Sequence, residues 1–205
     1  MSSAIRLGPS QFESRYGSLF RSIFRGTTAR RASFCKLDWD IVLTAGLFFE
    51  RRTDDYPLRA LSKFGALRTA LRATGDDRLI VSDIVTTPQH QWACLVPCDW
   101  DEYVNALFGP EPDTVLFAFG RAIFSPNGQW GAITHQQFTD HPNMPHYAIL
   151  GGTRNFMDIF IDGCGGREEL RRGFVDYLNF EPLSDWPSLP DDVKDTLLAD
   201  AGWRP

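Results

Sequence analysis

Residues 114–152 constrain the fold of this chain most strongly. The segment contains three runs rich in β-branched and aromatic residues, and the turn residues Pro126, Asn127 and Gly128 join the first two. An Asn-Gly pair between two such runs is characteristic of a β-hairpin. The third run, Tyr147–Gly152, follows a short polar insert. We therefore expect a hairpin plus a third antiparallel strand at the centre of the fold.

The rest of the chain supplies further elements of both kinds. Apolar spacing and turn residues predict short strands at 79–85 and 91–96. Helices are predicted at 10–24, 58–72, 100–108, 155–162, 167–179 and 191–201. The apolar segment 39–49 follows Asp38 and fits a helix, although its β-branched residues leave a strand possible. Links between strands are too short for parallel crossovers. The pattern indicates an α+β fold, with an antiparallel sheet of about five strands and helices packed mainly on one face.

With 205 residues, the chain fits one domain or one domain with appendages. Its apolar fraction of 43% is ample for a packed core. We divide it into a basic amphipathic N-terminal helix and connector (1–36), an α+β globular core (37–182) and a C-terminal tail with a short helix (183–205).

The N-terminal helix is strongly amphipathic. Its apolar residues recur at helical spacing, and Ser10 with Glu13 has the pattern of a capping box. The apolar face consists of Phe12, Tyr16, Leu19, Phe20, Ile23 and Phe24, and the other face carries Arg15, Arg21 and Arg25. Three interpretations are open: a helix packed on the core, a helix that docks on a partner or membrane surface, and an organelle transit peptide.

Charge is unevenly distributed along the sequence. The net charge is −5, but seven basic residues and one acid precede Asp38, so the remainder carries −11. An acidic body argues against nucleic-acid binding, which needs a positive face. It suits a basic protein partner instead.

The sequence favours a reduced, cytoplasmic protein. Its four cysteines (Cys35, Cys94, Cys98 and Cys164) are too few and too scattered for a disulfide scaffold. The longest apolar stretch, 41–49, is far shorter than the ~20 residues of a membrane span. No segment resembles a secretory signal.

Two places could hold reactive or metal-binding groups. His135, His141 and His146 lie within twelve residues and could ligate zinc, or belong to an ordinary solvated loop. Cys164 stands before a predicted helix, where a helix N-terminus would favour the thiolate. The glycines around Cys164 alternatively serve only to end one helix and begin the next.

Other motifs have simpler explanations. The segment 151–153 follows a strand and precedes a helix, a setting that can bind phosphate, but Thr153 as a helix cap explains it with less. The pair Cys94 and Cys98 lacks a second pair nearby. Paired acids fall in turns or at helix starts, where acids are expected in any case.

Two segments, 124–131 and Tyr147–Gly152, followed by Phe156 and Met157, resemble small bacterial immunity proteins encoded beside polymorphic or contact-delivered toxins. The resemblance covers about 45 residues and implies a non-enzymatic inhibitor that masks a toxin's active site without a cofactor. Within this hypothesis, aromatic anchors edged by carboxylates would suit a basic toxin surface. The candidate partner-binding residues are Asp99, Trp100, Asp101, Glu102 and Trp130. The alternative is a small cytoplasmic enzyme that uses Cys164 or a metal held by the histidine loop.

Overall fold

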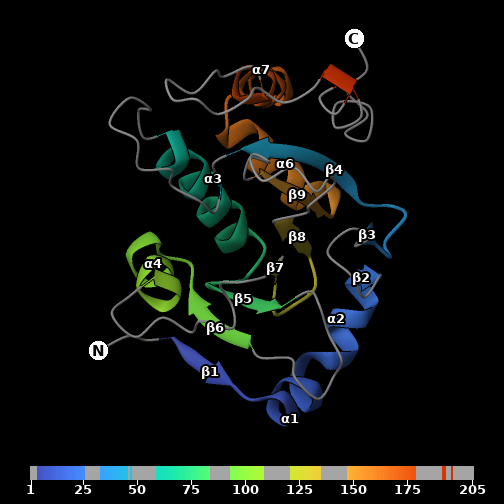
Figure 1. Cartoon of the computed structure of the whole chain (residues 1–205), viewed down its shortest axis with the longest axis vertical. Helices are drawn as coiled ribbons and strands as arrows, with labels where there is room; N and C mark the ends of the chain where they lie inside the picture. Colours follow the sequence, from blue (N-terminus) through green and yellow to red (C-terminus); the bar gives the residue numbers. More distant parts are fainter. Residues whose placement is uncertain are drawn as a thin grey trace.

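A seven-stranded antiparallel sheet forms the centre of the molecule in the computed structural model (Figure 1). The structure describes residues 4–25, 33–45, 47, 59–83, 93–108, 121–134, 147–178, 191–192 and 195. The strand order is β1-β6-β5-β7-β8-β9-β4. Its strands are β1 (Ile5–Leu7), β4 (Asp40–Ala45), β5 (Arg78–Asp83), β6 (Ala93–Pro97), β7 (Arg121–Phe124), β8 (Trp130–Thr134) and β9 (Tyr147–Gly152).

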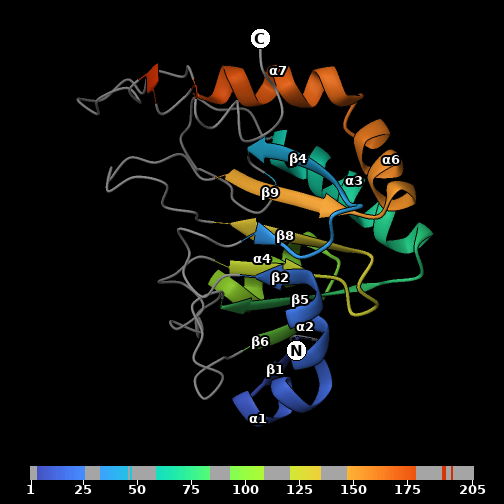
Figure 2. The ribbon, with the colours of Figure 1, turned by 90° about the vertical axis from the view of Figure 1, so that its right-hand side faces the viewer.

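Helices cover both faces of this sheet, rather than mainly one face as expected, because the N-terminal helical segment packs on the face opposite α3 and α6. The helical segments are α1 (Pro9–Phe12), the π-helical turn η1 (Glu13–Gly17), α2 (Ser18–Ile23), α3 (Arg59–Ala73), α4 (Trp100–Phe108), α6 (Arg154–Gly163) and α7 (Arg167–Leu178). A two-stranded ribbon pairs β2 (Phe24–Arg25) with β3 (Ser33–Phe34). In Figure 2, α3 lies behind the sheet and α2 lies in front of its lower strands, while α6 lies beside the end of β9 and α7 runs along β4. None of the described helices is long and apolar enough to cross a membrane.

Strand alternation creates two hydrophobic clusters, one on each face. On β7, Ile123 belongs to the larger cluster under α3 and α6, while Ala122 and Phe124 belong to the smaller cluster under α1 and α2. The α+β class and the antiparallel sheet are thus confirmed. The hairpin of β7 and β8 forms as predicted, and β9 pairs with β8 as its third strand.

Two strands that the sequence pattern did not single out complete the sheet at its edges. The segment that fitted either a helix or a strand is strand β4, which pairs with β9 from Asp40 opposite Gly152 to Ala45 opposite Tyr147. The helix interpretation was wrong here because β9 offers a ladder of backbone hydrogen bonds, and the β-branched residues Ile41 and Val42 suit that ladder. At the other edge, the three residues of β1 pair with β6.

The N-terminal segment packs on the core, as one of the three interpretations proposed. Phe12, Phe20 and Ile23 are buried in the smaller cluster. The helix begins after Gly8, whose backbone N–H donates to Gln11 Oε1 at 3.2 Å, so the predicted Ser10 cap is displaced.

A π-helical turn interrupts this N-terminal helix. Glu13 reaches across the turn to Arg21, with N···O distances of 3.0 and 2.9 Å. The hydrogen bond from Arg21 holds the pKa of Glu13 below its usual value. A Cβ on Gly17 would lie within 2.4 Å of the Glu13 carboxylate, so the glycine leaves room for that side chain.

Candidate functional site

Asp99 starts helix α4 by capping it. Its Oδ1 accepts hydrogen bonds from the backbone N–H groups of Asp101 at 3.1 Å and Glu102 at 3.3 Å. These are two of the N–H groups that a helix start leaves without an intrahelical partner. Its Oδ2 lies 4.0 Å from Arg68 Nη1 of α3. Asp99 is therefore already engaged within its own chain.

Trp100 rests on a platform of two other aromatic rings. Its ring centroid lies 5.1 Å from that of Phe64 on α3, edge to face, and 5.9 Å from that of Tyr103. Tyr103 is fully buried and contacts Phe64 as well, at 5.6 Å. Trp100 itself is only partly buried. The platform fixes the indole while leaving part of it at the surface.

Four of the five predicted residues therefore share one surface, which we call the α4 start: Asp99, Trp100, Asp101 and Glu102. Asp101 is exposed, whereas Glu102 is half-buried. The surroundings are not uniformly acidic. Arg68 and Arg72 of α3 are exposed, and both lie near enough to Cys98, which precedes Asp99, for their positive charges to lower its pKa. The α4 start is a mixed-charge surface with one aromatic ring at its centre.

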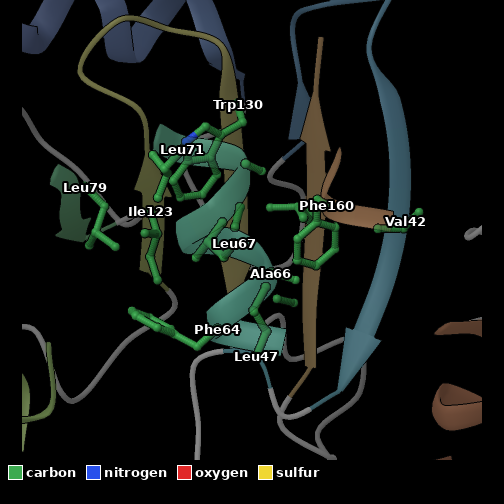
Figure 3. Close-up of a cluster of buried hydrophobic side chains, with 14 of the residues drawn as sticks. Val42, Leu47, Phe64, Ala66, Leu67, Leu71, Leu79, Ile123, Trp130 and Phe160 are labelled. Atoms are coloured by element: carbon green, nitrogen blue, oxygen red, sulfur yellow. The ribbon is translucent and has the colours of Figure 1, made fainter. Parts of the chain in front are cut away.

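The fifth predicted residue, Trp130, lies in the core rather than at the α4 start. It is fully buried and stacks on Phe156 of α6, with ring centroids 5.4 Å apart and planes inclined by 7°. Figure 3 shows it among side chains that α3 turns toward the sheet, such as Leu67 and Leu71. Its indole Nε1 has no hydrogen-bond partner among the described residues. Alternation along β8 places Trp130 and Ala132 on the same inward face, a signal already contained in the sequence.

The two cysteines with raised pKa values, Cys98 and Cys164, are poor nucleophiles. Burial raises the pKa of Cys164 to about 11, although the charge of Lys63 opposes the shift. Burial likewise raises the pKa of Cys98 to about 12. Both thiols are therefore protonated at neutral pH, and thiolate is the reactive form.

Cys164 follows the last turn of α6, and two glycines with left-handed backbone follow it. Gly165 and Gly166 have φ of 89° and 98°. The Gly166 N–H donates to Ile161 O at 2.9 Å, which closes the helix end. The glycine-rich segment thus ends α6 and allows the chain to enter α7.

The structure gives no support to a metal site in the part of the chain it describes. The three histidines His135, His141 and His146 lie outside the described residues. Across the described ranges, no three or more His, Cys, Asp or Glu side chains are grouped so that they could hold a metal ion. Cys94 and Cys98 are both buried.

The glycines before α6 serve packing rather than phosphate binding. A Cβ on Gly152 would lie 2.8 Å from Phe156 Cδ1 and 3.1 Å from the backbone oxygen of Gln129. The Thr153 N–H donates to that same Gln129 oxygen at 2.8 Å. This N–H is therefore not available to a phosphate.

A buried arginine that the sequence pattern did not single out joins Tyr103 of α4 to the sheet. Arg121 opens β7, is 1% exposed and hydrogen-bonds to Tyr103. Burial raises the pKa of Tyr103 to about 12, although the charge of Arg121 opposes this shift. A basic residue inside the apolar run 115–124 was the available signal, since a buried charge requires partners.

Comparisons with known proteins do not assign this arrangement. No protein-family model matches the sequence, and searches of the curated proteins and of the solved structures gave no significant match.

Proposed function

We propose that this chain is a non-enzymatic protein-binding domain of the immunity type, which neutralises a basic toxin by covering its active site with the α4 start. The observation that carries the proposal is the partly exposed Trp100, held by Phe64 and Tyr103 beside the exposed Asp101.

Trp100 has the properties of an interface anchor. Tryptophan is enriched among the residues that dominate binding energy. A ring already held in place loses little conformational freedom on binding, which lowers the cost of association. Phe64 and Tyr103 give Trp100 this support before any partner arrives.

Asp101 supplies the charge complementarity in this proposal. Its carboxylate is exposed, whereas that of Asp99 is engaged in capping α4. An exposed carboxylate at the rim of an interface attracts a basic partner and speeds the encounter. We therefore assign anchoring to Trp100 and steering to Asp101.

The enzyme alternative loses its support at Cys164. A nucleophilic cysteine needs a lowered pKa, whereas burial raises the pKa of Cys164 to about 11. The histidine loop remains a separate hypothesis, because its residues lie outside the described ranges.

The test is an affinity capture from the native host with the full chain as bait, followed by co-expression with the captured protein. We expect a basic protein whose toxicity is suppressed in stoichiometric amounts. Trp100→Ala should abolish capture and protection, and Asp101→Lys should weaken binding about tenfold, mainly through slower association.

Asp162→Lys is the matched control. Asp162 is also an exposed aspartate, but it lies on α6, which Figure 1 shows apart from α4. Circular dichroism would verify that each variant is folded. The proposal fails if folded Trp100→Ala and Asp101→Lys proteins protect as well as the Asp162→Lys control, or if a captured partner is not toxic.

A further inference from the structure

Two turns that are distant in sequence share a buried hydrogen-bonded corner. Asp76 lies between α3 and β5 and is 9% exposed, and Ser125 follows β7 and is fully buried. Ser125 Oγ lies 2.5 Å from Asp76 Oδ2 and is also hydrogen-bonded to Asn127 Oδ1. Asn127 Nδ2 donates to Thr74 O at 3.1 Å, which ties the two turns together a second time.

The number of protons available to these hydrogen bonds depends on whether the Asp76 carboxyl is protonated. A serine hydroxyl has one proton to donate. If Asp76 were ionised, Ser125 would face two oxygens that only accept, and one of the two short O···O contacts would lack a proton. The backbone N–H groups of Asn127 and Gln129 point to Ser125 Oγ at 3.1 and 3.3 Å, and the Gln129 N–H is shared with Asn127 Oδ1 at 3.2 Å. Neither N–H places a proton between Ser125 Oγ and the carboxylate, or between Ser125 Oγ and Asn127 Oδ1.

Turning the Asn127 amide over does not solve the problem. Its Nδ2 donates to Thr74 O, and its Oδ1 accepts from the Gln129 N–H at 3.2 Å. A flipped amide would set an oxygen against the carbonyl of Thr74 and an NH₂ group against the N–H of Gln129. The side-chain oxygen of Asn127 therefore faces Ser125.

We propose that Asp76 is a carboxylic acid in the folded protein, and that its ionisation is a pH-sensitive switch which loosens the β7–β8 turn from the α3–β5 turn. In the closed state Asp76 donates its proton to Ser125 Oγ, and Ser125 donates its own proton to Asn127 Oδ1. Each short contact then contains one proton. On ionisation the Ser125 proton turns to the carboxylate, and the contact with Asn127 loses its hydrogen bond.

The surroundings of Asp76 support the neutral form. Burial raises the pKa of Asp76, the hydrogen bond with Ser125 lowers it, and the charge of neighbouring Asp77 raises it. The turn of residues 125–129 contains no charged side chain. The two elements that flank Asp76 contribute Arg72, which is exposed near the end of α3, and Arg78 at the start of β5.

The sign of the pH dependence follows from this shift. A group whose pKa is higher in the folded state stabilises the fold fully below its unfolded pKa, about 3.9 for an aspartic acid. That stabilisation is lost as the pH rises through the folded-state pKa. The hydrogen bonds that join the two turns should therefore stabilise the fold more in mildly acidic solution than in neutral or alkaline solution.

The first measurement is a ¹³C NMR titration of the Asp76 side-chain carboxyl carbon in the full chain. We expect a midpoint above the ordinary value of about 3.9, and the amide signals of Asn127 and Gln129 should shift with the same midpoint. A midpoint at or below the ordinary value would overturn the proposal. This measurement needs no variant and is therefore independent of any folding defect.

The second measurement compares Asp76→Asn with the control Asp77→Asn. The side-chain amide of the Asp76→Asn variant can donate to Ser125 as the acid does. The denaturant midpoint of Asp76→Asn should therefore change at least twofold less than that of the wild type between about pH 4 and about pH 8. Asp77→Asn should retain most of the pH dependence, because Asp77 is exposed and its charge contributes less to the pKa of Asp76 than burial and the Ser125 hydrogen bond do. Equal pH dependence in Asp76→Asn and the wild type would refute the switch.

Discussion

Phe124→Ala is the substitution that most directly tests how the N-terminal segment is held. Phe124 lies at the end of β7 and is fully buried. Its ring centroid lies 6.4 Å from that of Phe12, 5.8 Å from that of Phe20 and 5.7 Å from that of Phe24, with edge-to-face geometry in each pair. The side chain of Phe124 thus contacts all three segments of the N-terminal layer, by which we mean α1, α2 and β2.

The expected loss of stability is large. Replacing a buried phenylalanine by alanine costs about 3–5 kcal/mol, through lost burial and the cavity that remains. Ring pairs add about 0.5–1.5 kcal/mol each beyond burial, and Phe124 loses three of them. We therefore expect a value near the upper end of the range, about 4–5 kcal/mol. Domains have only about 5–15 kcal/mol of stability in total.

Guanidinium unfolding, followed by circular dichroism and tryptophan fluorescence, measures this loss. Leu37→Ala is the control, because Leu37 is 91% exposed and its removal should change the free energy of unfolding by less than about 0.5 kcal/mol. A loss below about 1.5 kcal/mol for Phe124→Ala, with one cooperative transition, would show that the N-terminal layer does not pack on the sheet as described. We expect deletion of residues 1–36 to prevent folding of the remainder. If the N-terminal segment did not pack on the sheet, the remainder would stay folded after this deletion.

Two further predictions concern Trp130 and Cys164. Trp130→Phe should cost less than about 1.5 kcal/mol of unfolding free energy, because it removes an indole N–H that has no partner among the described residues while keeping a ring against Phe156. A loss of about 3 kcal/mol or more would refute this expectation. Cys164 should react with iodoacetamide near pH 7.5 at least tenfold more slowly in the folded chain than in guanidinium, because burial raises its pKa to about 11; equally fast labelling, located by peptide mass spectrometry, would contradict the buried environment.

Elements with strong local signals were predictable from the sequence. Helix α4 has the predicted bounds, Trp100–Phe108, because Asp99 caps it from within the same short segment. The hairpin of β7 and β8 follows from its turn, where Gly128 adopts φ of 76°. Helices α6 and α7 lie within one or two residues of their predicted bounds. In each of these cases the determining interaction lies within a few residues along the chain.

The candidate site was predictable only in part. The residues of the α4 start were identified because they are contiguous, but the platform under Trp100 depends on Phe64 from another helix. Trp130 was assigned to the same site, although the alternation of β8 turns it into the core. Composition identified an aromatic residue but not the direction in which it points.

By itself, the sequence determined the fold class, the central hairpin and the positions of most helices, because periodicity and turn residues act over short distances along the chain. Only the tertiary structure decided that 40–45 is a strand, since its hydrogen bonds are made with β9 about a hundred residues away. The tertiary structure likewise decided that Arg121 is buried beside Tyr103 and that Asp76 meets Ser125. Burial and pairing of polar groups depend on which distant segments pack together, and local residue patterns do not contain that information.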